Sequence, residues 1–160
     1  IAYGPENMGF FADLTVKYNM LRAARGAMTA AQMDSTRLEW IFKLFPAVEK
    51  FWNHPAGKLS GGQKQMVAVS RAIVEPRDLL IVDEPSKGLA PAIINNMIDA
   101  FDQLKKSGVT ILLVEQNINF AKRLGDTVAV MDNGKVVHAG SMAALAEDEA
   151  LQRSLLGLAL

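Results

Sequence analysis

The run Leu79-Leu80-Ile81-Val82-Asp83-Glu84-Pro85 joins four apolar residues to two adjacent carboxylates. A short, fully apolar run is typical of a strand buried in a parallel sheet, and we predict a strand over Asp78–Val82. Open α/β sheets bind their ligands beyond the carboxyl ends of the strands. There, Asp83 can hold the water shell of Mg²⁺, while Glu84 can orient or deprotonate an attacking water. Two solvated carboxylates in a turn are the alternative, and for this motif alone the two interpretations are about even.

A second motif, Leu59-Ser60-Gly61-Gly62-Gln63-Lys64-Gln65, stands upstream of that run. Ser60-x-x-Gln63 is a capping box, which predicts that Ser60 begins a helix. Gly61 and Gly62 then occupy the first turn, where each costs about 1 kcal/mol relative to alanine. Close approach of a ligand to the backbone would justify that cost, and a helix start favours an anion. An ordinary glycine loop is the favoured alternative for Ser-Gly-Gly alone, but the full motif is much more specific.

The bulk composition describes a globular chain rather than a disordered one. Half of the 160 residues are hydrophobic, and Lys plus Arg equals Asp plus Glu at 17 each. Balanced charge argues weakly against nucleic acid, which usually requires a clustered basic excess. The chain has no cysteine, so disulfides and thiolate metal sites are excluded. Its apolar runs are far shorter than a membrane span of about 20 residues.

Apolar periodicity predicts alternating helices and strands. Helices are expected over Thr15–Arg25, Thr29–Leu44, Ser60–Glu75, Pro91–Ser107, Asn117–Leu124 and Ser141–Leu156. Strands are expected over Asp78–Val82, Val109–Val114, Thr127–Met131 and Lys135–Ala139, the last two joined by a hairpin turn. Val48–Lys58 is expected to be a loop with a short helical turn. This order indicates an α/β fold with a mostly parallel sheet covered on both faces, preceded by a helical sub-lobe over Thr15–Pro46.

The two motifs, with Arg71-Ala72-Ile73 and Pro76 between them, resemble the ATP-binding subunit of ABC transporters. The resemblance covers nearly the whole chain and implies a partial P-loop NTPase (ABC ATPase) fold. It implies three segments along the chain. These are the Q-loop end and helical subdomain (1–58), the signature helix with the Walker B and switch half of the core (59–140), and a C-terminal helical tail (141–160).

By this resemblance, Asp83 is the Walker B residue that holds Mg²⁺ through water, and Glu84 is the catalytic base. Ser86-Lys87-Gly88-Leu89 looks like the D-loop that links the two sites of a dimer, so Ser86 and Gly88 are expected at the nucleotide. The signature residues expected at the γ-phosphate of ATP held by the opposite subunit are Ser60, Gly61, Gly62 and Gln63.

Two departures from the family pattern restrict the resemblance to one group of subfamilies. Gln116 stands where most members have a histidine that senses the γ-phosphate; its amide can hydrogen-bond a phosphate oxygen but cannot carry charge. Tyr3-Gly4-Pro5-Glu6 resembles the Q-loop, with Glu6 where glutamine is usual. Both replacements, and Gly88-Leu89-Ala90-Pro91, are similar to the branched-chain amino acid uptake subfamily and its urea and amide relatives. A solvated loop amide is the alternative for Gln116.

The sequence contains no phosphate loop of the form Gly-x-x-x-x-Gly-Lys-Ser/Thr. Its Gly-Lys pairs, Gly57-Lys58 and Gly134-Lys135, are followed by Leu and Val. We therefore interpret the chain as the C-terminal portion of a longer subunit and expect these 160 residues alone not to turn over ATP. We also expect a gap or an exposed edge in the sheet.

The resemblance implies a subunit that uses ATP and Mg²⁺ to energise an importer of branched-chain amino acids or related small solutes. Its implied partners are a second ATP-binding subunit (identical or different), transmembrane permease subunits and, indirectly, a solute-binding protein, at the cytoplasmic face of the membrane. A nucleic acid partner is not expected. The alternatives are a soluble ABC-type ATPase acting on ribosomes or DNA, and a non-catalytic remnant that supplies the signature to a partner.

Overall fold

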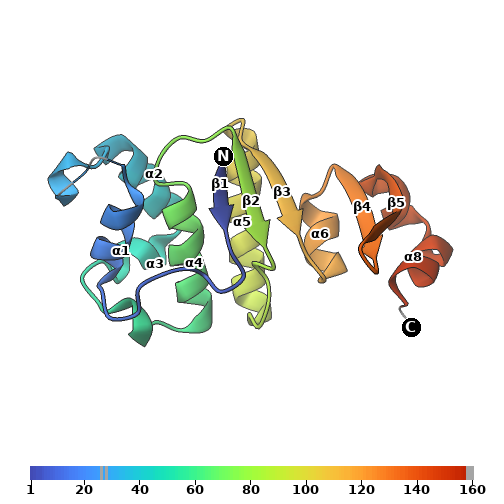
Figure 1. The fold of residues 1–160 in the computed structure, drawn as a ribbon, viewed down its shortest axis with the longest axis horizontal. Coiled ribbons are helices and arrows are strands. Elements are labelled where there is room, and N and C mark those ends of the chain that lie inside the picture. The colour runs from blue at the N-terminus through green and yellow to red at the C-terminus, as the bar shows by residue number, and fades with distance from the viewer. Residues whose placement is uncertain (26, 28, 158–160) are drawn as a thin grey trace. The chain divides into compact units, whose positions relative to one another are not determined.

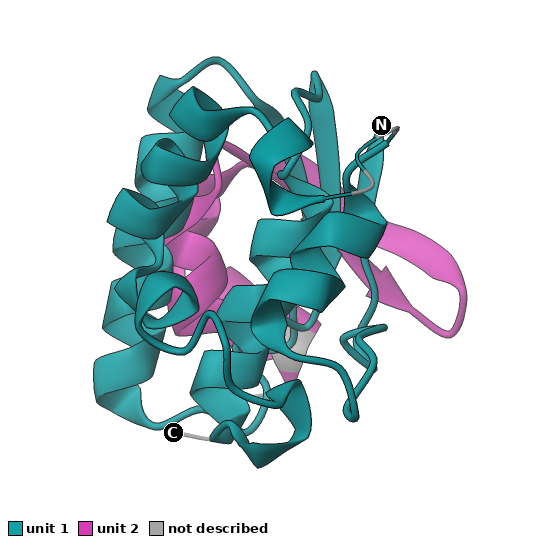
Figure 2. Cartoon of the chain, turned by 90° about the vertical axis from the view of Figure 1, so that its left-hand side faces the viewer, with its two compact units in different colours: residues 1–116 teal, residues 117–160 magenta. Residues whose placement is uncertain are grey.

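The computed structural model describes residues 1–25, 27 and 29–157. The chain divides into two compact units, Ile1–Gln116 and Asn117–Leu160 (Figure 2). The division at residues 58 and 140 that the motifs suggest stays a prediction.

A parallel three-stranded sheet forms the centre of the first unit (Figure 1). Its strands are β1 (Ala2–Gly4), β2 (Leu79–Asp83) and β3 (Thr110–Val114), in the order β1-β2-β3. All three strands run in the same direction, so their carboxyl ends lie side by side at one end of the sheet, which we call its carboxyl edge. The two strands predicted in this region are confirmed to within one residue at each end, and so is the parallel α/β core.

The outer strand β3 corrects one expectation. Its side chains alternate in exposure, with Leu112 54% and Val114 49% exposed, so the expected cover on both faces is wrong for this strand. Among the described residues, β3 pairs with β2 alone. β3 is therefore an edge strand, which fits the expected exposed edge, and one of its faces also stays open although four of its five residues are apolar.

Helices of the first unit lie beside this sheet, and the first two of them fall within the segment expected as a helical sub-lobe, Thr15–Pro46. They are α1 (Val16–Ala23), α2 (Ser35–Leu44), α3 (Pro46–Lys50), α4 (Gly61–Ala72) and α5 (Pro91–Lys106). Helix α4 packs between α1 and β1, and α5 runs along one face of the sheet (Figure 1). The inner stripe of α5 is apolar and buried, with Phe101 and Leu104 fully inaccessible. Burial of that stripe fixes α5 against the sheet.

The single helix expected over Thr29–Leu44 is wrong. The capping box at Thr29 opens only a 3₁₀ turn, Ala30–Gln32, and the chain is extended at Met33. The Asp34 side chain then accepts a hydrogen bond from the Arg37 N–H at 3.0 Å and begins α2. Two competing N-caps within one apolar pattern thus split the segment.

Three other boundaries differ from expectation. The loop expected over Val48–Lys58 begins inside α3, which starts at Pro46, and contains a second 3₁₀ turn over Ala56–Lys58. Helix α4 stops at Ala72 rather than Glu75, because Pro76 disfavours helical backbone at the residue that precedes it. Helix α1 likewise ends two residues early, at Ala23.

The second unit is a short helix, a hairpin and two further helices. These are α6 (Ile118–Leu124), β4 (Thr127–Asp132), β5 (Lys135–Ser141), α7 (Met142–Glu147) and α8 (Glu149–Leu156). The hairpin is confirmed, with positive φ at Asn133 and Gly134 as a primed turn requires. The single tail helix is wrong, because the Asp148 side chain caps a new helix by accepting from the Leu151 N–H at 2.8 Å.

None of the helices in the described part of the chain is long and apolar enough to cross a bilayer.

Candidate functional site

The candidate site lies at the carboxyl edge of the sheet, where β2 and β3 end side by side. Asp83 pairs with Val114 in register, so Glu84 and the Glu115-Gln116 pair follow at neighbouring strand ends. The Glu84 N–H continues the ladder by donating to the Val114 carbonyl at 2.8 Å. The register of β2 and β3 therefore brings these polar residues together.

The backbone of Glu84 adopts a left-handed conformation, with φ of 45°. For a residue with a side chain this region is disfavoured and costs on the order of 1–3 kcal/mol. The turn continues with the Lys87 N–H donating to the Glu84 carbonyl at 3.2 Å. Strain of this kind, held by flanking hydrogen bonds, is concentrated at functional sites.

Both carboxylate oxygens of Glu84 have a donor. The Gln116 Nε2 donates to Oε1 at 2.5 Å, and the Lys87 ammonium lies 3.0 Å from Oε2. The Glu84 side chain is only 15% exposed. The structure thus joins two of the residues that the sequence predicts for one site, Glu84 and Gln116.

Glu6 reaches the same cluster from the segment that follows β1. Its Oε1 lies 2.5 Å from the Lys87 ammonium. The hydrogen bonds from Lys87 to Glu6 and then to Glu84 raise the pKa of Lys87 above its ordinary value. Lys87 appears in the sequence only as a member of the D-loop stretch. No local signal could identify its role, because Glu6 is far away along the chain.

The segment that contains Glu6 is anchored further along. The Arg71 guanidinium donates to the Gly9 carbonyl, and the Asn19 side chain both accepts from the Phe11 N–H at 2.7 Å and donates to its carbonyl at 2.9 Å. Burial, followed by the charge of Arg22, lowers the pKa of Arg71. These contacts tie the segment to α4 and α1.

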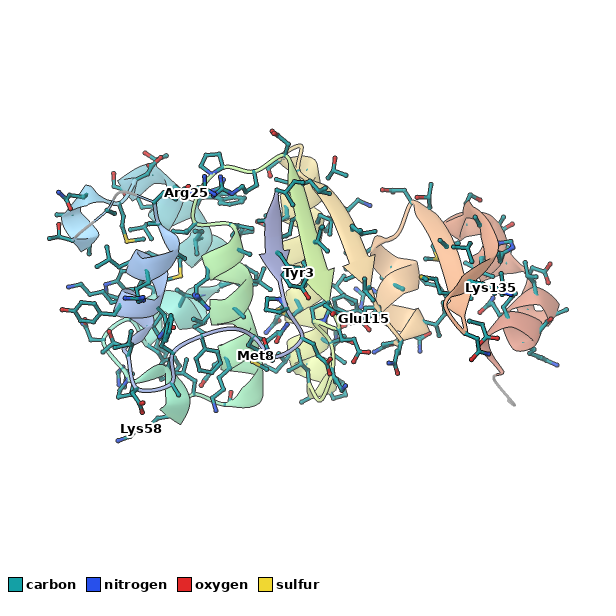
Figure 3. The ribbon with its side chains drawn as sticks, viewed as in Figure 1. Tyr3, Met8, Arg25, Lys58, Glu115 and Lys135 are labelled. Atoms are coloured by element: carbon teal, nitrogen blue, oxygen red, sulfur yellow. The ribbon has the colours of Figure 1, made fainter. Side chains whose placement is uncertain are left out.

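The loop after Glu84 is held by a residue that sequence reasoning missed. The Ser86 N–H donates to Glu115 Oε1 at 2.8 Å, and Ser86 is buried. Glu115 lies at the end of β3 and is labelled in Figure 3. Gly88 has φ of 70°, a conformation that a side chain would strain. A carboxylate directly after an apolar strand sequence was the available signal for Glu115.

Asp83, the predicted metal residue, is the last residue of β2 and is half-buried. In the described ranges, no group of three or more His, Cys, Asp or Glu side chains could enclose a metal ion. A single carboxylate still fits Mg²⁺, which keeps several waters and takes further oxygen ligands from substrate phosphates. The donor set therefore suits a metal that arrives with a nucleotide.

The predicted capping box is present at the start of α4. Ser60 Oγ accepts from the Gln63 N–H at 3.4 Å, and Gln63 Oε1 accepts from the Ser60 N–H at 2.9 Å. Among the described residues, no hydrogen bond or ion pair joins this turn to the Glu84 cluster. The signature residues and the carboxylates thus form two separate groups within the first unit.

The two signature glycines differ in their surroundings. A Cβ at Gly62 would lie 2.7 Å from Cγ2 of Ile93, so close packing against α5 explains that glycine. A Cβ at Gly61 would meet nothing within 4 Å. Packing therefore gives no reason for glycine at position 61, where the expectation of close ligand approach still applies.

Known proteins resemble this chain in sequence and in structure. The sequence model of the family described as ABC transporter matches residues 1–87. The high-affinity branched-chain amino acid transport ATP-binding protein BraG of Pseudomonas aeruginosa is 38% identical over 98% of this chain and 66% of its own length. The probable branched-chain amino acid transport ATP-binding protein LivF of Archaeoglobus fulgidus is 33% identical over 99% and 66%. The chain spans about two thirds of the length of these relatives.

Solved structures agree on the fold. A component of an ABC transporter complex from Clostridium perfringens superposes with a TM-score of 0.76 at 25% identity, over 98% of this chain and 62% of that one. A dimeric ATP-binding cassette in a post-hydrolysis state, bound to ADP and Pi, gives 0.74 at 25% identity, over 88% and 62%.

Proposed function

Because the chain belongs to the ABC transporter family, we propose that it provides the hydrolytic carboxylates and the signature turn of an ATPase subunit. The subunit energises import of branched-chain amino acids or related small solutes. The observation that supports this most strongly is the Glu84 carboxylate, held between Gln116 and Lys87 at the carboxyl edge of the sheet.

Glu84 acts in this proposal as the general base. Its carboxylate orients the attacking water and accepts the proton as the water attacks the γ-phosphate. The Gln116 amide donates to Glu84 Oε1 at 2.5 Å, which fixes the carboxylate, and the same amide can turn to a phosphate oxygen. Asp83 would hold Mg²⁺ through water, and the ion would neutralise charge on the phosphates.

The signature turn acts on a nucleotide held by a second copy of the protein. The free N–H groups at the start of α4 and the positive end of its dipole favour a phosphate. Gly61 supports this role, since neither packing nor positive φ requires glycine there. In the interface between the two copies, Ser86 and Gly88 would lie near the nucleotide. Glu6 would lie at the edge of the nucleotide site.

The names of the relatives support the proposed solute class. BraG and LivF are named for branched-chain amino acid transport, and other relatives are named for arginine and methionine. We therefore place the subunit on permease partners at the cytoplasmic face of the membrane. An ATPase that acts on ribosomes or DNA is less favoured, because these relatives are all transport subunits.

The test is turnover by the complete protein, expressed from its own gene. Magnesium-dependent ATP hydrolysis is expected, and Glu84→Gln should lower it by about 10²-fold or more with ATP still bound. Glu39→Gln on the exposed face of α2 is the matched control and should have no effect. Full activity of Glu84→Gln would refute the role of Glu84.

No turnover at all by that complete protein would instead favour the non-catalytic alternative. The 160 residues alone should be inactive, because they contain no Gly-x-x-x-x-Gly-Lys-Ser/Thr sequence.

A further inference from the structure

The ammonium of Lys87 contacts carboxylates from two distant parts of the chain. Its Nζ lies 2.5 Å from Glu6 Oε1 and 3.0 Å from Glu84 Oε2. Glu6 belongs to the segment after β1, and Glu84 to the turn after β2. An ammonium has three N–H donors, so it can serve both carboxylates at once.

The sheet makes this contact possible. Strands β1 and β2 are parallel neighbours, with Gly4 opposite Val82. The two following segments therefore leave the same edge of the sheet side by side. Lys87 lies in the turn that also contains Glu84, and its side chain joins the two segments.

Stability alone does not explain this bridge. The side chains of Lys87 and Glu6 are 60% and 52% exposed, and exposed ion pairs contribute little to folding. Glu84, at 15% exposed, is the shielded member. With Gln116 on Oε1 and Lys87 on Oε2, its carboxylate is held from both sides.

We propose that Lys87 is a positioning residue, which orients the Glu84 carboxylate and couples that orientation to Glu6. Glu6 holds the Lys87 ammonium, and the ammonium fixes Oε2 of Glu84. The orientation of the Glu84 carboxylate then sets the position of the Gln116 amide, which donates to Oε1. The importance of this coupling for turnover rests on the proposed role of Glu84 as base. The coupling itself can be measured without turnover.

The first test is NMR of the Gln116 side-chain amide in the 160-residue chain, with a dispersed spectrum as the check on folding. Lys87→Met and Glu6→Ala should each shift the Gln116 Nε2 resonances, although the described hydrogen bonds join both residues to Gln116 only through Glu84. In the Lys87→Met background, Glu6→Ala should add no further shift, because the path between them is already broken. Lys87→Arg should restore most of the original position.

The matched control is Lys106→Met. Lys106 forms an equally short pair with Asp102, at 2.5 Å, on the exposed side of α5. Its removal should leave the Gln116 resonances in place. An unchanged Gln116 amide in Lys87→Met would refute the proposal, and so would shifts from Lys87→Met and Glu6→Ala that simply add.

The second test is turnover by the complete protein. Lys87→Met should lower kcat by up to about fivefold, the range open to an exposed ion pair, and leave KM for ATP within about twofold. A change confined to KM would contradict positioning. If the Gln116 shifts are seen but Glu84→Gln leaves turnover intact, the coupling stands and the proposed function fails.

Discussion

Alanine at Gly62 should destabilise the protein, whereas alanine at Gly61 should stabilise it. Both positions lie in the first turn of α4, where removing glycine gains up to about 1 kcal/mol. At Gly61 the new methyl group meets nothing within 4 Å, so the gain is kept. The sequence gives no hint of this difference between two adjacent glycines.

At Gly62 the new Cβ would lie 2.7, 3.2 and 3.4 Å from Cγ2, Cγ1 and Cβ of Ile93. Cβ is fixed by the backbone of α5, and Cγ1 and Cγ2 can move only by rotation about χ1, which is strongly restricted for a β-branched residue in a helix. Overpacking of this kind costs about 1–3 kcal/mol. After the propensity gain, Gly62→Ala should be about 1–3 kcal/mol less stable than Gly61→Ala.

Urea unfolding of the two variants measures this difference directly. Ile93→Ala removes the atoms that clash, so Gly62→Ala should cost much less in that background. Equal unfolding free energies for Gly61→Ala and Gly62→Ala would refute the packing explanation. The same pair tests function, since Gly61→Ala should weaken ATP turnover by the complete protein despite its added stability.

Three further predictions concern the fold and the charged cluster. Asn19→Leu should lower the unfolding free energy by about 2–4 kcal/mol, because the fully buried Asn19 amide is lost together with its hydrogen bonds to the N–H and carbonyl of Phe11; a urea midpoint like that of wild type would contradict this. Phe101→Ala should cost about 3–5 kcal/mol by the same assay, since the ring is fully buried in α5, and a loss below about 1 kcal/mol would show that α5 is loosely packed. Because the pKa of Lys87 is raised, its pairs are complete below the ordinary lysine pKa of about 10.4 and are lost only as pH rises through the higher folded value. The Gln116 shift caused by Lys87→Met should therefore be the same at pH 6 and pH 8, and a shift that disappears at pH 8 would be inconsistent with the bridge.

The sequence predicted the central strands because their signal is local. Apolar runs that end in polar residues identified β2 and β3, and Ser60 with Gln63 identified the start of α4. The same kind of signal failed at Thr29, where a complete capping box opened only a 3₁₀ turn. A local motif cannot show that a second cap, at Asp34, lies a few residues on.

Other features that the sequence did not predict depend on tertiary contact. The reason for glycine at position 62 is Ile93, which lies on another helix. The role of Lys87 depends on Glu6, which only the pairing of β1 with β2 brings near. Exposure of Leu112 depends on what packs over that face of β3, and an apolar strand sequence does not reveal that.

The central claim is that Glu84 of one copy acts on a nucleotide completed by the Ser60–Gln63 turn of another. Its most direct test mixes two inactive variants of the complete protein, Glu84→Gln and Gly61→Arg, and measures ATP turnover. In a mixed dimer, one site keeps an intact Glu84 and an intact signature turn from opposite copies. Equal mixing should therefore restore about a quarter of wild-type turnover in a symmetric dimer. A mixture that stays as inactive as its components would contradict the claim.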